Sequence, residues 1–328
     1  MIQFDAWAPS TRGTLCSQQR SFLSFLESYS FTEFPVQPDT LVFYASFLVM
    51  TGRIKSAGSI RQYLSAASTL HKMYGLTCAT PSTYGPLHNI VKGIERGYSS
   101  PPKHRLPISK EILTNLIIHL NSIIYSTASW ASRMTALSIK AVYLVLFYSM
   151  LRAGNTLPHS AREFNPLRHL SWGRVSHHAE GVILSVSLSK TIQFQERVHQ
   201  IPLARCENVH LCPVSALEDL VAARGPNLCG SSDPVFAFPQ DGSWAPLPKQ
   251  TVVRHFNGQL AAMGLDPRDY SLHSFRHGGI SFALLADNPV AWIRLNSDHR
   301  SECIFGYLNL EAERRFVVTK RMAAMMAS

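Results

Sequence analysis

The residues whose types and spacing could do chemistry lie between positions 273 and 307. His273 and Arg276 are three residues apart in a segment with helical character, so both side chains are expected on one side of a helix. His299 and Tyr307 follow, eight residues apart, on either side of an expected helix start at Ser301. A phenol beside imidazoles and a guanidinium is suited to attack on a phosphodiester: tyrosine oxygen is the nucleophile, and fixed positive charge stabilises the phosphate.

This region resembles the tyrosine recombinases, and the type IB topoisomerases that share their catalytic core. The signature of that family is HxxR, then His or Trp, then a Tyr a short distance further on. The sequence most resembles the eukaryotic transposon enzymes of the Crypton and DIRS/Ngaro groups. Their corresponding motifs are similar to HSFRRGG followed by GDWRSDAYxRYL. This chain has HSFRHGG and SDHRSECIFGYL. His299 takes the place of their Trp, and most bacterial and phage recombinases have His there.

Two upstream segments extend the resemblance. LRAGNTLP (151–158) resembles LRKSNLxP of those transposon enzymes and places the family's first arginine at Arg152. LSKTIQF (188–194) resembles the strand and turn that hold the family's lysine, which gives Lys190. The likeness runs from about residue 8 to residue 310, includes APSTRGT and LCPVSAL, and supplies six matching positions in family order.

The resemblance implies DNA cleavage through a 3′-phosphotyrosine bond, which keeps the bond energy for rejoining. Tyr307 is then the nucleophile. Arg152 and Arg276 hold the non-bridging phosphate oxygens, because planar guanidinium groups match phosphate in bidentate fashion. They do the work of the Mg²⁺ ions in a metallonuclease, so neither a metal nor another cofactor is expected.

The other three positions handle protons and hydrogen bonds. Lys190 shares strand parity with Leu188 and Val186, which predicts that it points inward and protonates the leaving 5′-oxygen. His273 helps to take the phenol proton, and His299 donates a hydrogen bond to the phosphate.

Composition and charge agree with a DNA partner. The chain has 328 residues, of which 46% are hydrophobic and 16% charged, enough for a sizeable core and about two domains. Lys and Arg number 31 against 21 Asp and Glu, and the net charge of +10 favours a polyanion. No stretch approaches the ~20 apolar residues of a membrane helix. The start does not read as a secretory signal, so an intracellular protein without a membrane partner is expected.

The first domain is predicted to be a small all-α bundle, residues 1–96. Apolar residues recur at i, i+3, i+4 and i+7 in four segments that begin at positions 22, 41, 60 and 87. Its polar faces are mostly basic, with few acids to offset them, which indicates a phosphate-facing side. The DNA-binding candidates there and in the following connector are Arg61, Lys92, Arg96, Lys103 and Arg105.

Residues 97–107, GYSSPPKHRLP, predict an extended linker, because three prolines and a glycine do not continue a helix. The catalytic domain is assigned to 108–310. A strand at 182–188 with an antiparallel partner at 198–203 forms its small sheet. Its helices are predicted around 113–120, 139–146, 213–224, 249–263, 274–286, 289–296 and 301–309. The fold class is mainly α with a small antiparallel β-sheet, the two-domain DNA clamp of the tyrosine recombinase or type IB topoisomerase type.

Three further features have structural interpretations. Two cysteines and a histidine fall within 206–212 but lack the paired spacing of a zinc site, so ordinary thiols are expected. Gly278 and Gly279 lie inside a predicted helix, which indicates close packing by another backbone or by DNA. His169 is predicted to be a solvated loop residue.

Three functions stay open from the sequence. The first is a strand-exchange recombinase of a mobile element that acts in the nucleus as a homotetramer on double-stranded DNA, and is a monomer or dimer when free. The second is a relaxing enzyme of the type IB topoisomerase kind, and the third is a domesticated DNA-binding protein without catalysis. The six intact positions favour catalysis, and the short chain with its transposon-like wording favours the recombinase. By resemblance, a C-terminal helix at 311–328 is expected to dock into a neighbouring subunit.

Overall fold

The structure is a computed structural model. It describes residues 7, 9–31, 33–54, 57–98, 105–126 and 128–298. Contacts divide the chain into two compact units, Met1–Lys103 and His104–Ser328, each with its own hydrophobic core. Five predicted features lie outside the described residues: Lys103, His299, Tyr307, the helix at 301–309 and the tail at 311–328.

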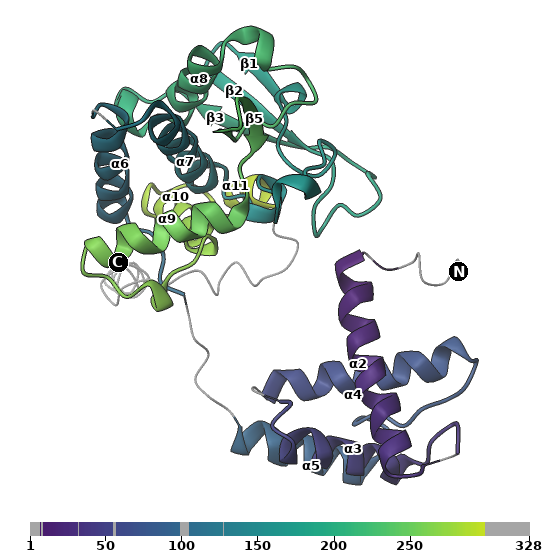
Figure 1. Ribbon diagram of the computed structural model, residues 1–328. Helices are drawn as coiled ribbons and strands as arrows, with labels where there is room; N and C mark the ends of the chain where they lie inside the picture. The colour runs from purple at the N-terminus through teal and green to yellow at the C-terminus, as the bar shows by residue number, and fades with distance from the viewer. Residues whose placement is uncertain are drawn as a thin grey trace, which may run out of the picture. The chain divides into compact units, whose positions relative to one another are not determined.

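The first unit is a helical bundle, as predicted (Figure 1). Its helices are α2 (Pro9–Ser28), α3 (Pro38–Met50), α4 (Ala57–Met73) and α5 (Gly85–Gly97). The apolar faces found in the sequence are the buried ones: Phe22, Tyr44, Ile60 and Leu87, one from each helix, have no exposed surface. Burial of these faces stabilises the bundle, because isolated helices of this length are marginal in water.

The second unit is organised around α7 (Trp130–Ser149). This helix packs against α6 (Lys110–Ile124), α8 (Pro213–Arg224), α10 (His273–Leu285) and β4 (Ala237–Gln240) (Figure 1). Every residue from 136 to 147 is buried. A helix that is buried on all sides must be surrounded by other elements, and α7 therefore forms the centre of this core.

The predicted pair of strands is confirmed, within a sheet that is larger than expected. Strand β2 (Gly181–Val186) pairs antiparallel with both β1 (Val175–His178) and β3 (His199–Ala204), and its alternate residues face the core. A second antiparallel sheet joins β4 to β5 (Ser243–Pro246). The expectation of a single sheet was wrong, because β1 and β5 have exposed or half-buried residues without a buried alternate face, and β4 contains a proline.

Local signals set the ends of the other helices. Pro213 is the first residue of α8, and Gly225, with φ of 85°, follows its last residue, as predicted. The remaining helices are α9 (Lys249–Ala262) and α11 (Val290–Ser297). Short 3₁₀ turns connect the described elements: η1 (Ala153–Asn155), η2 (Ala161–Glu163), η3 (Trp172–Arg174), η4 (Val209–Leu211), η5 (Pro226–Leu228) and η6 (Pro267–Asp269).

The cysteines near α8 are structural. The Cys212 sulfur accepts hydrogen bonds from the backbone N–H groups of Cys206 and Ser215, so it caps the start of α8. No group of three metal-ligating side chains occurs among the residues that the structure describes. Over the same residues, no helix has the length and apolar character needed to cross a bilayer.

The glycine pair of α10 allows this helix to touch α7. A Cβ on Gly278 would overlap the backbone carbonyl of Ile108, and one on Gly279 would overlap that of Phe147. The protein's own backbone therefore accounts for both glycines.

Candidate active site

The start of α10 places two of the predicted catalytic residues. His273 is its first residue and Arg276 lies one turn later, so the expected shared helix is confirmed. Ser271 and Ser274 fix this start. The Ser271 hydroxyl accepts from the His273 N–H at 3.2 Å, and the Ser274 hydroxyl accepts from the Ser271 N–H at 3.1 Å.

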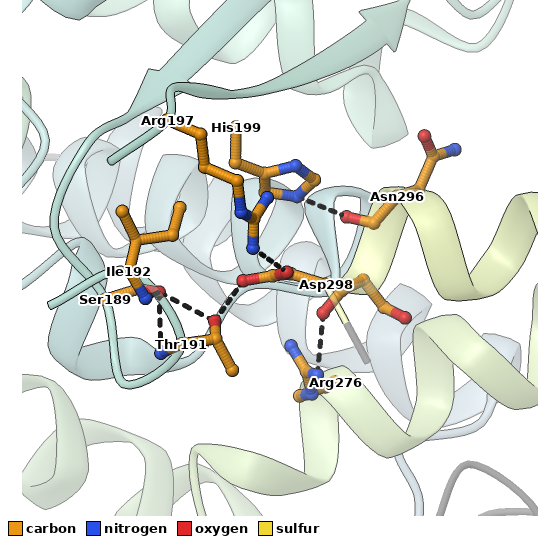
Figure 2. A network of polar contacts seen from close by, with 9 residues as sticks. Ser189, Thr191, Ile192, Arg197, His199, Arg276, Asn296 and Asp298 are labelled. Carbon is orange, nitrogen blue, oxygen red and sulfur yellow. Dashed lines mark hydrogen bonds and ion pairs between the residues drawn. The ribbon is translucent and has the colours of Figure 1, made fainter. Parts of the chain in front are cut away.

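Arg276 joins three segments of the second unit. Its side chain is 1% exposed, and it donates one hydrogen bond to the Met150 carbonyl. It donates another, of 2.7 Å, to the Ser297 carbonyl, which is the dashed line from Arg276 in Figure 2. Met150 follows α7 in the left-handed conformation, two residues before Arg152. Ser297 ends α11, two residues before His299. The buried guanidinium of Arg276 thus links two backbone segments, and each segment lies two residues before another predicted catalytic position.

Three of the six predicted catalytic residues, Arg152, His273 and Arg276, belong to one cluster whose positive charge comes from the arginines and Lys249. Burial, followed by electrostatic repulsion from His277, Arg276, Arg152 and Lys249, lowers the pKa of His273 to about 4. His273 is therefore neutral at pH 7, which is the form that accepts a proton.

Arg152 lies in the turn after α7. Its side chain is half-buried, and its carbonyl accepts from the Asn155 N–H at 2.8 Å, which closes the turn. The charge of Arg152 also acts on His273, the first residue of α10, and disfavours protonation of its ring.

Lys249 is a member of the cluster that the sequence analysis missed. It is the exposed first residue of α9, and its N–H donates to the Pro158 carbonyl at 2.8 Å. A cation in the first turn opposes the helix dipole, so this position costs helix stability unless an anion binds there. A lysine at an expected helix start is therefore a pattern, visible in the sequence, that could have indicated an anion-binding position.

The predicted orientation of Lys190 was wrong. Strand β2 ends at Val186, and Lys190 is an exposed residue of the turn in which the Ser189 N–H donates to the Ile192 carbonyl at 2.8 Å. Alternation of side chains applies only within a strand, so parity with Val186 says nothing four residues later. Lys190 lies in the loop between β2 and β3, and its own carbonyl accepts from Gln193 at 3.2 Å.

The basic face of the first unit contains an acid that balances it. Arg61 contacts Glu95 at 2.5 Å and Lys92 contacts the same carboxylate at 3.7 Å, while Arg96 is exposed one residue further along α5. The hydrogen bond from Arg61 lowers the pKa of Glu95. The expectation that few acids offset these cations therefore fails at this point, because Glu95 lies one turn from Lys92 on α5 and faces Arg61 on α4.

Arg105 belongs to the second unit. It is exposed, and its guanidinium donates to the Arg268 carbonyl. The neighbouring backbone follows the same loop: the Leu106 N–H donates to the Asp269 carbonyl at 2.8 Å, and the Ile108 N–H donates to the Ser274 carbonyl at 3.0 Å. These bonds attach the end of the linker to the start of α10.

His169 is buried rather than solvated. It is 6% exposed, and its Nδ1 accepts from the Asn165 N–H at 3.0 Å. Burial, reinforced by the charge of Arg168, lowers the pKa of His169 to about 4. No periodic pattern of apolar residues surrounds His169 in the sequence, so its burial could not be predicted.

Replacing Lys249 by alanine is expected to raise the pKa of His273, because a positive neighbour is removed. An NMR titration of the His273 ring measures the pKa. Lys110→Ala is the matched control, since Lys110 is also an exposed lysine at the first position of a helix. An equal pKa in Lys249→Ala and wild type would contradict the cluster.

The same pKa values determine how stability changes with pH. The folded pKa of His273 and of His169 is about 4, below the ordinary 6.5, so the unfolded chain binds more protons between these values. The free energy of unfolding is therefore expected to fall as the pH is lowered from about 6.5 to 4. Urea titrations of His169→Gln, across that range, should show a weaker pH dependence than wild type.

Comparison with known proteins shows which solved structures share this fold. No protein-family model matches the sequence, and no curated protein matches it. A solved structure of XerH site-specific recombinase bound to palindromic difH substrate is similar with a TM-score of 0.64 at 15% identity, and the match covers 97% of this chain and 80% of that one. The Tn1549 transposon integrase with transposon right end DNA gives 0.59 at 13%, covering 95% and 93%.

A lambda integrase tetramer bound to a Holliday junction gives a TM-score of 0.51 at 15% identity, covering 92% of this chain and 72% of that chain. The predicted fold class is confirmed: the chain has the fold of the tyrosine recombinases.

Proposed function

We propose that this chain is a DNA strand-exchange recombinase of a mobile element related to the Crypton and DIRS/Ngaro groups. It cuts and rejoins double-stranded DNA through a 3′-phosphotyrosine intermediate, without metal or external energy, as a homotetramer on DNA in the nucleus. The observation that supports this most is the convergence of Arg152, His273 and Arg276 in one positive cluster within a tyrosine recombinase fold.

The proposed reaction exchanges one phosphate ester for another. The phenolic oxygen of Tyr307 attacks phosphorus, and its proton passes to neutral His273. The bond between phosphorus and the 5′-oxygen breaks, and its electron pair stays on the leaving oxygen. That oxygen then receives a proton from the Lys190 ammonium. Arg152 and Arg276 offset the charge that develops on the non-bridging oxygens. Attack by a 5′-hydroxyl reverses every step, which joins the strands without an external energy source.

A pool of nicked suicide duplexes with a randomised central sequence tests the proposal, because it does not require the target site to be known. Cleavage beside the nick releases a short strand, so religation fails and the covalent complex accumulates. Denaturing electrophoresis separates that complex, and sequencing of its DNA reports the site. We expect a protein–DNA band with wild type and none with Tyr307→Phe.

The alternatives give different results in the same assay. A protein that retards duplex DNA in a native gel yet forms no covalent band is a DNA-binding protein without catalysis, and the proposal fails. A protein that forms the band and relaxes a supercoiled plasmid that lacks the selected site acts as a type IB topoisomerase. Exchange of strands between two duplexes with the selected site supports the recombinase.

Lys190→Ala is expected to slow cleavage of an ordinary 5′-oxygen leaving group by about a hundredfold or more. Cleavage at a 5′-bridging phosphorothiolate should change little, because sulfur leaves without a proton. Single-turnover rates on the two substrates measure this difference. Equal losses on both would remove Lys190 from the role of proton donor.

Glu95→Gln is expected to tighten binding of a 30-bp duplex by roughly threefold to tenfold at low salt, because Arg61 and Lys92 lose their shared carboxylate. The gain should shrink as salt is raised. Fluorescence anisotropy across a salt series measures both effects. Glu33→Gln is the matched control: it removes the same charge from an exposed acid of the first unit that contacts Gln37 instead of a cation. Equal gains in the two variants would show that this face does not contact DNA.

A further inference from the structure

The loop that carries Lys190 is attached to the end of α11. The Asp298 carboxylate accepts from the Arg197 guanidinium at 2.5 Å through one oxygen and from the Thr191 hydroxyl through the other (Figure 2). Thr191 follows Lys190 directly. We call the three residues Thr191, Arg197 and Asp298 the loop latch.

Two further sets of contacts reinforce the loop latch. The buried His199, first residue of β3, donates from Nε2 to the Asn296 carbonyl at 3.0 Å. Within the turn, the Ser189 hydroxyl accepts from the N–H groups of Thr191 and Ile192, both at 3.1 Å (Figure 2). The turn around Lys190 is therefore ordered internally and also fixed to a second element.

Asp298 is an unfavourable choice for the helix that it ends. It follows α11 in the left-handed conformation, with φ of 52°, where glycine has no steric penalty. A carboxylate there also opposes the helix dipole. The contacts of its side chain explain why an acid is present.

The ion pair of the loop latch is partly protected from water. The Asp298 side chain is 11% exposed and that of Arg197 is 36% exposed. Burial favours the protonated acid, but the hydrogen bonds from Thr191 and Arg197 outweigh it and lower the pKa of Asp298. A charge-assisted pair with a second donor is stronger than an exposed surface pair.

The loop latch is continuous with the buried arginine of the active site. Ser297, whose carbonyl accepts from Arg276 at 2.7 Å, directly precedes Asp298 (Figure 2). A single short segment at the end of α11 therefore contacts Arg276 through one residue and the Lys190 loop through the next.

We propose that Asp298 and Arg197 are positioning residues that hold the Lys190 turn in register with Arg276, so that the proton donor and the phosphate-binding charge are presented together. This inference rests on the proposed function for its chemical consequence. The attachment of the loop itself does not depend on DNA.

The first measurement is hydrogen exchange of residues 187–198 in the full chain without DNA. Asp298→Asn keeps the size of the side chain and tolerates the left-handed conformation, but it removes the charge. We expect exchange in this loop to accelerate about tenfold or more in Asp298→Asn and in Arg197→Gln. Asp287→Asn is the matched control, because Asp287 is an exposed acid in the same conformation after α10.

The second measurement compares cleavage of the two suicide substrates, with oxygen or sulfur as the leaving atom. We expect Asp298→Asn to slow the oxygen substrate by about tenfold to a hundredfold and the sulfur substrate by less than about threefold, as for Lys190→Ala. Arg197→Lys, which keeps the charge, should fall between wild type and Arg197→Gln. A purely structural defect would slow both substrates equally.

The outcomes separate this inference from the proposed function. Unchanged exchange in Asp298→Asn overturns the loop latch, whatever the activity. Faster exchange with equal losses on both substrates overturns its role in positioning Lys190. Absence of a covalent band with wild type overturns the proposed function, and the exchange result then decides whether the loop is held as described.

Discussion

Arg276→Ala is expected to lower the rate of DNA cleavage by at least about a hundredfold, to the same extent with an oxygen or a sulfur leaving group. The charge of Arg276 serves the phosphate, so its loss does not depend on the proton needed by the leaving atom. Removal of the Arg276 side chain also breaks the link between Met150 and Ser297, because Arg276 donates a hydrogen bond to the carbonyl of each. Single-turnover cleavage of both substrates measures the loss.

The same substitution should destabilise the second unit. Two buried carbonyls lose their donor, at about 1–3 kcal/mol each, and a cavity remains. Urea unfolding measures this effect, with Arg268→Ala as a control, because Arg268 is 89% exposed. Arg276→Lys keeps a charge with a smaller cavity and serves as the folded variant. Cleavage at the wild-type rate in Arg276→Lys would contradict the role of a fixed guanidinium.

Gly279→Ala is expected to cost about 2–3 kcal/mol of stability and to reduce cleavage as well. The new methyl group would overlap the Phe147 carbonyl, so α10 must move away from α7. That movement would displace His273 and Arg276, which lie on the same helix.

Gly258→Ala provides the matched control for the glycine substitution. Gly258 also lies inside a helix, α9, but no other atom would contact its Cβ. Alanine there should stabilise the protein by roughly 0.5–1 kcal/mol, because it has the higher helix propensity. Urea unfolding and cleavage rates compare the two variants. Equal effects would show that the close approach of α10 to α7 is not important.

The parts of the fold that sequence could predict are those with strong local signals. Proline at 213 and glycine at 225 set the bounds of α8, and apolar spacing located the helices of the first unit. The HxxR spacing likewise placed His273 and Arg276 on one helix. In each case the interactions that determine the structure lie within one helical turn or along one face of a helix.

The parts that could not be predicted depend on contacts distant in sequence. The burial of His169 and the pairing of Glu95 with Arg61 arise only when separate segments fold together. Lys190 was misplaced because nothing local marks the end of β2 at Val186. The role of Asp298 could not be predicted because its partners Thr191 and Arg197 are about a hundred residues away in sequence.

The central claim is that this chain forms a covalent bond to DNA through Tyr307. The most direct test isolates the protein–DNA complex from the suicide-substrate pool, digests both components and identifies the modified peptide by mass spectrometry. The account predicts a nucleotide attached through its 3′-phosphate to the oxygen of Tyr307, and no adduct in Tyr307→Phe. A nucleotide attached to any other residue, or the absence of an adduct from a wild-type protein that binds the pool, would contradict it.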